Sequence, residues 1–215
     1  MRDEGGPLET GLGRVVIGGA VHLGAPLLII ANIPVPAVIG ALIAGTAVAL
    51  MLRAPASNRH RWWLRALGAD LALLLALTAA TLLGHLTAVV AFAWLTAYCG
   101  AFVLYGWTME VLARSVNDRP GARRWGRTTA HVFRASSLVL ATAVAALATH
   151  DLRVVHGAYR FSSPGPASLA FLGAVALLTG LVLQWGPDTL RIQRALQSHF
   201  EAEPLRRMRS ALTAE

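Results

Sequence analysis

The chain has 215 residues, of which 55% are hydrophobic and 14% are charged. A water-soluble globular domain carries about a quarter charged residues, so this composition excludes one and indicates a protein whose solvent is lipid. The formal net charge is +8, and all 19 basic residues are arginine. The lack of lysine excludes a Schiff base between a side-chain amine and a carbonyl ligand. The single cysteine, Cys99, excludes an internal disulfide and a cysteine metal cluster.

Six apolar segments follow one another along the chain. Each is close to the length of about 20 residues that a helix needs to cross the hydrocarbon core of a bilayer. Backbone groups in lipid must be hydrogen-bonded within their own segment, so each segment is predicted to be a helix. The sequence therefore predicts an all-α, polytopic transmembrane helix bundle. The predicted spans cover residues 13–31, 34–52, 63–84, 86–109, 128–149 and 166–185.

These spans divide the chain into three regions. Residues 1–12 form a polar N-terminal segment, residues 13–187 the transmembrane helix bundle, and residues 188–215 a C-terminal tail. In the tail, apolar residues such as Leu190 and Leu196 recur at helical spacing among arginines. This pattern is typical of a basic amphipathic helix lying on a membrane surface. Binding of a partner protein by the tail is a second interpretation.

Arginines are distributed unevenly over the connections between spans. The first and third connections contain none, and the fifth contains only Arg153 and Arg160. The positive-inside rule therefore places the second and fourth connections and both termini in the cytoplasm. The positive charge then faces the anionic lipids of the inner leaflet and not a nucleic acid. We expect the cell membrane of a bacterium or an archaeon. The arginines concerned are Arg53, Arg59, Arg61 and Arg65; Arg114, Arg119, Arg123, Arg124 and Arg127; and Arg191, Arg194, Arg206, Arg207 and Arg209.

Aromatic and small residues add detail to this bundle. Trp62, Trp63 and Trp125 lie at cytoplasmic ends of predicted spans, as expected for an interfacial aromatic belt. Pairs of small residues four apart let neighbouring helices approach closely. They favour a compact bundle and allow a homodimer. The pairs are Ala20 and Gly24, Ala41 and Gly45, Thr96 and Gly100, and Ala176 and Gly180.

One acid, Asp70, lies well inside a predicted span, about 10 Å along the helix from Trp63. A short carboxylate at this depth costs a few kcal/mol, so it should face the bundle and be paired or protonated. Arg134 enters the fifth span about as far from the same side, and Glu110 lies near the cytoplasmic end of the fourth. We therefore expect an Asp70–Arg134 pair near Glu110.

Three interpretations of these polar residues stay open. The first is a structural ion pair that orients two helices. The second is a pocket for a ligand, an ion or a proton, formed by Asp70, Glu110 and Arg134 together with His22 in the first span. In the third, Asp70 lies closer to the interface than the span boundary suggests. His22 is expected to be a hydrogen-bonded interior residue, because no histidine pairs with another ligand at matching depth; no metal or haem site is predicted.

Common catalytic signatures are absent from the sequence. It contains no GxSxG, no HExxH, no Walker loop and no paired acidic repeat for a diphosphate substrate. The glycine-rich stretch near the N-terminus precedes a span and not a phosphate-binding helix. The sequence therefore favours a protein without catalytic activity.

The stretch AYCGAFVLYGWTMEVLARSVN, residues 97–117, resembles the fourth helix of heliorhodopsins, which ends in a similar aromatic-Gly-x-x-Met-Glu pattern. That family also has a cytoplasmic N-terminus, a His-Leu in its first helix and a sixth helix between Pro-Gly and a Gln-aromatic pair. His22-Leu23, Pro164-Gly165 and Gln184-Trp185 stand in comparable places. Heliorhodopsins, however, have seven helices and a retinal-binding lysine in the last. Their second-helix histidine is absent here, and their third-helix glutamate counterion has no clear equivalent, although Asp70 stands nearby.

These features predict a membrane protein of heliorhodopsin-like layout that binds a ligand or signals. The resemblance implies that retinal, if bound at all, is bound without a covalent link; no other cofactor is predicted. A small transporter or channel that uses the buried acid is the main alternative. An intramembrane enzyme acting on a lipid or prenyl substrate, with Asp70 or Glu110 as general acid, is a further one.

Overall fold

The computed structural model describes residue 14 and residues 35–52, 58–83, 87–115, 117–155, 158–161, 165–192 and 194. Five helices and one antiparallel hairpin follow one another in this part of the chain. A helical stretch after residue 184 extends the last helix to Ile192. The elements are α3 (Val35–Leu52), α4 (Asn58–Leu82), α5 (Ala88–Ser115), α6 (Arg119–Ala148), β1 (Leu152–Val155), β2 (Ala158–Phe161) and α7 (Pro166–Leu183).

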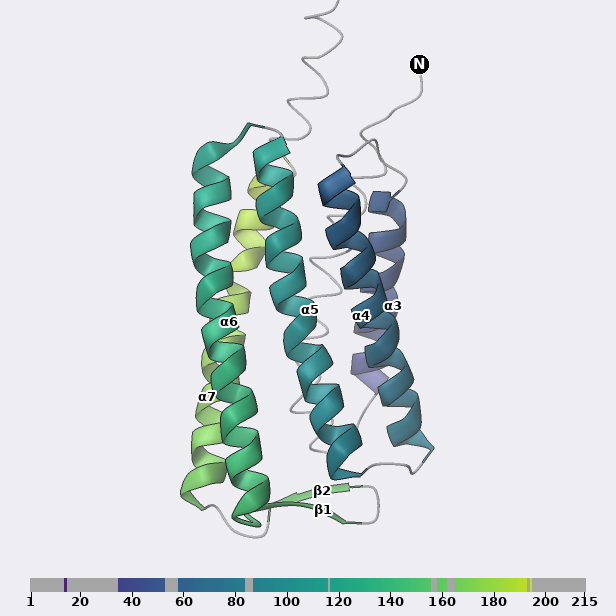
Figure 1. Cartoon of the computed structure of the whole chain (residues 1–215), viewed down its shortest axis with the longest axis vertical. Coiled ribbons are helices and arrows are strands. Elements are labelled where there is room, and N and C mark those ends of the chain that lie inside the picture. Colours follow the sequence, from purple (N-terminus) through teal and green to yellow (C-terminus); the bar gives the residue numbers. More distant parts are fainter. Residues whose placement is uncertain are drawn as a thin grey trace, which may run out of the picture.

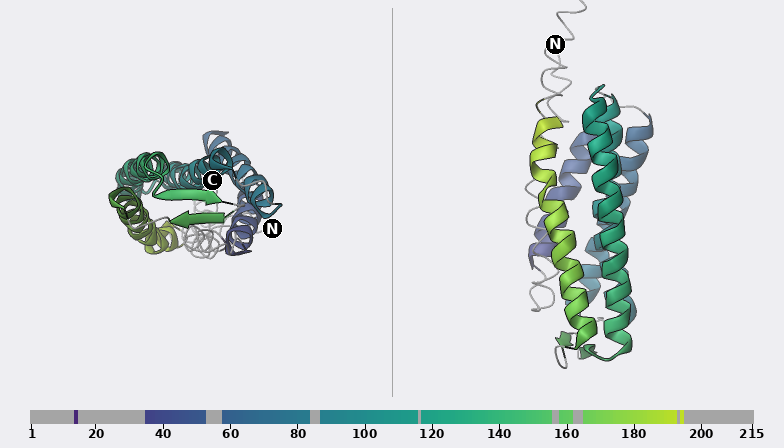
Figure 2. Two further views of the ribbon diagram at one scale, coloured as in Figure 1. Left: turned by 90° about the horizontal axis from the view of Figure 1, so that it is seen from below. Right: turned by 90° about the vertical axis from the view of Figure 1, so that its left-hand side faces the viewer.

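The helices run up and down, and each packs against the next one along the chain. α4 and α6 begin at one end of the bundle, and α5 and α7 finish there (Figure 1). The hairpin lies across the opposite end (Figure 2). We call the first end the arginine end. Its described arginines are Arg59, Arg61, Arg65, Arg114, Arg119, Arg123, Arg124, Arg127, Arg191 and Arg194.

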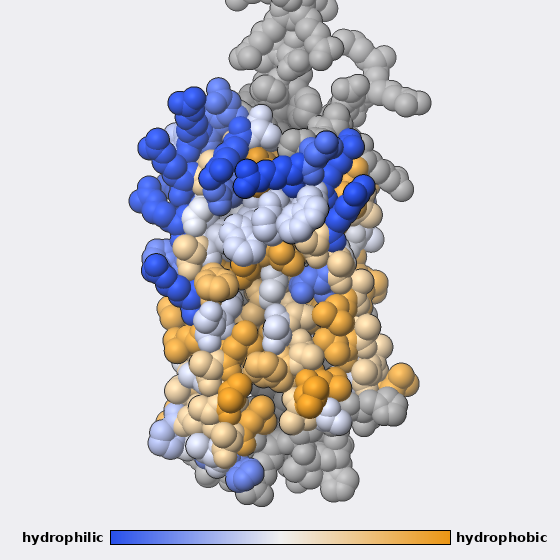
Figure 3. Space-filling model, in the orientation of Figure 1, coloured by the Kyte–Doolittle hydropathy of each residue, from blue (hydrophilic) through white to orange (hydrophobic). Residues whose placement is uncertain are grey.

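Four helices in the described part are long and apolar enough to cross a membrane: Asn58–Thr81, Ala88–Ser115, Arg119–Ala148 and Pro166–Ile192. Large apolar side chains are exposed on their outer surfaces, including Leu73, Phe133 and Leu169. Most hydrophilic surface gathers at the arginine end, and hydrophobic surface covers the bundle below it (Figure 3). An apolar outer surface of this extent is that of a membrane-embedded bundle.

Most of the predicted spans coincide with these helices. The spans predicted over 63–84, 86–109, 128–149 and 166–185 are confirmed as helices, and the span over 34–52 falls on α3. The span predicted over 13–31 lies outside the described residues except for Arg14. α4, α5, α6 and the extended α7 are longer than their predicted spans. An apolar window detects only the part within hydrocarbon, whereas a helix continues into the polar region.

The start of α6 is capped. The Oδ1 atom of Asp118 accepts a hydrogen bond of 3.0 Å from the backbone N–H of Gly121, and Pro120 occupies the first turn, where its missing N–H costs nothing. Asn117 has a φ of 60°, a left-handed conformation that asparagine tolerates well. This tight turn lets α6 fold back along α5.

The hairpin was not expected from the sequence, which suggested only a connection between spans. Its strands pair antiparallel in register, with Leu152 opposite Phe161 and Val155 opposite Ala158. Strands of four residues carry too little alternation to be distinguished from a loop. The hairpin closes the turn from α6 to α7 at the end opposite the arginine end.

Aromatic side chains form a continuous row through the core. Trp94 stacks on Tyr98, whose ring meets Phe102, and Trp185 of the α7 extension contacts Phe102. Trp185 also packs against Tyr105 and Trp125, with ring centroids 5.5 and 5.4 Å away. α5 lies between α4 and α6, contributes most of these rings, and is the central helix of the described bundle.

Candidate functional site

Asp70 projects from α4 toward α5 in the middle of the bundle. It flanks the buried stripe of α4 formed by Leu67, Leu71 and Leu74, so it is half-buried. A methyl group added at Gly100 of α5 would lie 3.2 Å from the Oδ1 atom of Asp70. Glycine at this position therefore makes room for the carboxylate. Its other oxygen, Oδ2, is buried and has no hydrogen-bond partner in the described part of the structure.

The Cys99 thiol lies near this carboxylate, and Ser136 lies beyond the thiol. The thiol of Cys99 on α5 is close to both the Asp70 carboxylate and the hydroxyl group of Ser136 on α6. The Ser136 Oγ atom is buried, and the Cys99 thiol is the polar group beside it. We call Asp70, Cys99 and Ser136 the central polar cluster. It spans three consecutive helices, and Cys99 and Ser136 were not recognised from the sequence as members of a polar site.

Glu110 does not join this cluster. It lies between α5 and α6, where a methyl group added at Gly126 would meet its carboxylate at 3.3 Å. It forms an ion pair with Arg114 one turn later on its own helix. Like Asp70, Glu110 therefore occupies space left by a glycine of the neighbouring helix, but its charge is neutralised within α5.

The expected Asp70–Arg134 pair is not formed. Glu110 pairs with Arg114 and Arg124 with Asp188, and neither of these ion pairs includes Asp70 or Arg134. Arg134 is exposed on the outer face of α6, and α5 separates that face from α4. The two residues enter the bundle to similar depths, but their positions around the helix axes point them in different directions.

The histidines have different placements. His22 lies outside the described residues. His60, in the first turn of α4, is completely buried. It precedes Leu64, Leu67, Leu71 and Leu74 at helical spacing, so the same periodicity that marks the buried stripe of α4 includes it. Among the described residues, no group of three His, Cys, Asp or Glu side chains is arranged to hold a metal ion.

The three tryptophans that were predicted to lie at the membrane interface have different environments. Trp62 is 60% exposed and contacts Trp63 edge to face, and Trp63 packs on Trp107 with ring centroids 5.0 Å apart. Trp125, in contrast, is 2% exposed and packs against Tyr105. It is part of the core and does not lie at the membrane interface where the sequence placed it, because it belongs to the buried stripe of α6.

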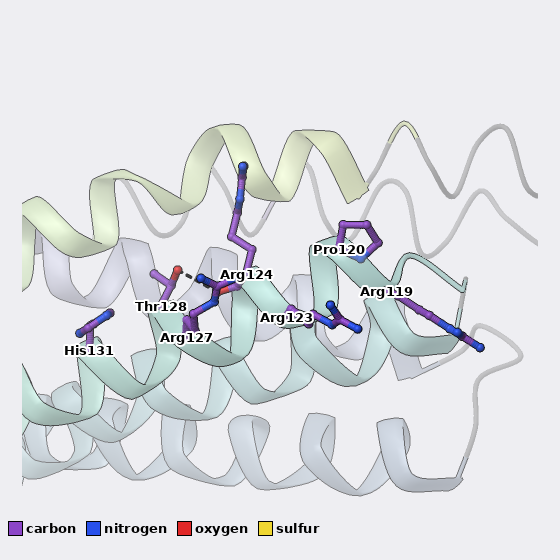
Figure 4. A pocket seen from close by; sticks show the side chains of 7 residues that line it. All are labelled: Arg119, Pro120, Arg123, Arg124, Arg127, Thr128 and His131. Atoms are coloured by element: carbon purple, nitrogen blue, oxygen red, sulfur yellow. Dashed lines mark hydrogen bonds between the residues drawn. The ribbon is translucent and has the colours of Figure 1, made fainter.

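A second polar site lies on the surface at the arginine end. One face of α6 lines a pocket of about 720 Å³ (Figure 4). Arg124 extends toward α7 and forms an ion pair of 2.9 Å with Asp188, while the hydroxyl group of Thr128 donates to the Arg124 carbonyl oxygen. We call it the arginine pocket. Its lining residues are Arg119, Pro120, Arg123, Arg124, Arg127, Thr128 and His131.

The extension of α7 connects this site to the core. The hydroxyl groups of Tyr105 and Thr189 share a buried hydrogen bond of 2.8 Å, and Ile192 is 1% exposed. The first residues of the predicted tail therefore continue the last helix and pack against α5 and α6.

No family model, no curated protein and no solved structure matches the chain.

Proposed function

We propose that this chain is a multi-pass membrane protein of heliorhodopsin-like layout that binds a ligand or signals, without catalysis and without covalently bound retinal. Six spans with both termini in the cytoplasm follow from the arginine distribution. The gathering of arginines from α4, α5, α6 and the α7 extension at one end of the bundle supports this orientation. The cell membrane of a bacterium or an archaeon is the corresponding location.

The buried, unpartnered Oδ2 atom of Asp70 is the observation that carries the binding function. An unsatisfied buried polar group costs about 1–3 kcal/mol, and more if it is charged. Most such groups in folded proteins have a partner, which can be a protein group, an ordered water or an ion. The buried hydroxyl group of Ser136 lies on the other side of Cys99, beside its thiol. A ligand that supplies the missing hydrogen bond at Asp70 would remove the penalty there.

The cluster favours a cationic ligand or one that donates hydrogen bonds. Asp70 offers carboxylate oxygens, and the hydroxyl group of Ser136 both donates and accepts. No arginine of the described residues forms an ion pair with Asp70, so a positive charge can be supplied from outside. We therefore assign the ligand pocket to the central polar cluster, in place of the Asp70–Glu110–Arg134 grouping.

Replacing Asp70 tests this assignment through stability. Asp70→Asn keeps the shape and removes the unpaired charge, so the ligand-free protein should gain free energy of unfolding on the order of 1 kcal/mol, or about 2–4 °C in melting temperature. Asp188→Asn is the matched control. It makes the same chemical change at a carboxylate that is paired with Arg124 and should be neutral or slightly destabilising. The measurement is thermal unfolding of the detergent-purified chain.

Ligand binding is measured on the same variants. Sodium, potassium and short alkylammonium ions are added in turn, and at least one should raise the melting temperature of the parent chain and of Asp188→Asn, but not of Asp70→Asn. If Asp70→Asn instead lowers the melting temperature, Asp70 has a structural role and the proposal is wrong. If the parent chain in liposomes carries an ion flux that Asp70→Asn abolishes, the protein is a transporter or channel.

A retinal test addresses the heliorhodopsin-like layout. Since the sequence has no lysine, retinal added during purification should give no visible absorbance band that hydroxylamine bleaches by attacking a Schiff base. Such a band would contradict the proposal that this layout operates without the covalent chromophore.

A further inference from the structure

The arginine pocket has more positive charge than the surrounding side chains neutralise. Of its four arginines, only Arg124 has an ion pair among the described residues, with Asp188. Arg123 and Arg127 are exposed and occupy the same face of α6 (Figure 4). Guanidinium groups arranged in this way match the geometry of phosphate oxygens, which they bind with paired hydrogen bonds. The pocket is therefore suited to a phosphate-bearing anion.

The face of α6 beyond the pocket indicates what carries this phosphate. Arg134 follows Arg127 after about two helical turns on the same face, and Leu138 follows about one turn later. Leu138 is 46% exposed, and Phe133 on the adjacent flank is 54% exposed. The surface thus changes from cationic to apolar along one helix, in the direction from the arginine end into the apolar part of the bundle.

A cationic surface followed by an apolar surface matches the phosphate group and the acyl chains of a membrane lipid. We infer that the arginine pocket binds the phosphate of an anionic membrane lipid, whose acyl chains lie along the exposed apolar face of α6. The volume of about 720 Å³ lies within the range of small-molecule sites. Arg134, which pairs with neither acid of the bundle, then lies between the phosphate group and the acyl chains. A free phosphate ion has no acyl chains and would leave the exposed apolar face of α6 without a ligand.

Two double variants separate this site from general attraction between a basic protein and an anionic lipid. Arg123→Gln/Arg127→Gln removes two charges from the pocket. Arg59→Gln/Arg61→Gln removes two charges from exposed side chains of α4 at the same end of the bundle. Both variants change the net charge equally and replace exposed side chains, so neither should prevent folding, which circular dichroism and gel filtration verify.

The measurement is native mass spectrometry of the detergent-purified full chain titrated with short-chain phosphatidylglycerol. We expect the pocket variant to bind about tenfold more weakly, the size of effect that lost charge-assisted hydrogen bonds produce, and the α4 variant to bind like the parent. Phosphatidylcholine should bind more weakly than phosphatidylglycerol to the parent chain. Equal losses in both variants, or no loss in either, would overturn the pocket as a lipid site.

Inorganic phosphate distinguishes the two sources of the anion. If the lipid is the ligand, phosphate at the concentration of bound lipid should not displace phosphatidylglycerol from the parent chain. Displacement at comparable concentrations would show that the pocket recognises the free anion, and the assignment to a lipid would be wrong. The outcome at Asp70 has no bearing on either result, because the two sites share no residue.

Discussion

Gly106 of α5 lies directly against Thr129 of α6, and replacing it with alanine gives a strong test of the packing. A methyl group at this position would lie 2.9 Å from the Cγ2 atom of Thr129 and 3.1 Å from its Cβ atom, and would collide with its Oγ1 atom. Thr129 is 1% exposed. Its hydroxyl group donates a hydrogen bond of 2.7 Å to the Trp125 carbonyl oxygen, so the side chain cannot rotate away without losing that bond.

The expected size of the effect follows from two opposing contributions. Overpacking a core costs about 1–3 kcal/mol, and a contact below 3.0 Å with a side chain held by its own hydrogen bond belongs at the upper end. Alanine in place of glycine within a helix contributes about 1 kcal/mol in the opposite direction. Gly106→Ala should therefore lower the free energy of unfolding by about 2 kcal/mol.

Gly173→Ala is the matched control. Gly173 lies within α7 and has no atom within 4 Å of an added methyl group, so only the gain of about 1 kcal/mol remains. The two variants should differ by about 3 kcal/mol, or roughly 6–12 °C in melting temperature for a chain of this size, measured by thermal unfolding in detergent. Adding Thr129→Ala to Gly106→Ala should recover part of the loss. The close α5–α6 packing is refuted if Gly106→Ala is as stable as Gly173→Ala.

Three further predictions concern buried groups. Tyr105→Phe removes the hydrogen bond to Thr189 and should cost about 1 kcal/mol in thermal unfolding; an unchanged melting temperature would mean that the α7 extension is not held by this bond. Trp94→Phe removes the donor of the 2.9 Å hydrogen bond to Thr78 and should lower the free energy of unfolding by about 1 kcal/mol or more. Thr78→Val removes the acceptor and should give a similar loss if this hydrogen bond is the cause. Cys99 is buried, so a maleimide should label it only after denaturation; rapid labelling of the folded chain would contradict its buried position on α5.

The helices and the clustering of arginines at one end could be predicted from composition and apolar length. Both features depend on averages over many residues, and a misjudged boundary leaves them intact. The polar pairings could not be predicted as well, because the sequence argument used depth alone. Asp70 and Arg134 lie at similar depths, but a pair also requires that both side chains point toward each other.

The helical periodicity of α6 explains why Arg134 does not point toward Asp70. Trp125, Thr129, Val132 and Ser136 recur along its buried face, and at about 100° per residue Arg134 falls on the opposite side. The same period places Trp125 in the core and brings Ser136 toward Cys99. The contact of Trp185 with Trp125 and Tyr105 could not be predicted from the sequence, since it depends on how far the last helix continues and against which neighbours it packs.

The contact between the indole rings of Trp125 and Trp185 gives the protein an intrinsic spectroscopic signal. Their ring centroids are 5.4 Å apart and their planes are inclined by 57°, so the electronic transitions of the two indoles are coupled and should produce an exciton couplet in circular dichroism. One indole belongs to α6 and the other to the α7 extension. Trp62, Trp63 and Trp107 also lie close together, so the contribution of the Trp125–Trp185 pair is the part of the signal that Trp185→Phe removes. Loss of that part would report the separation of these two helices without any label and while the helical content is still intact.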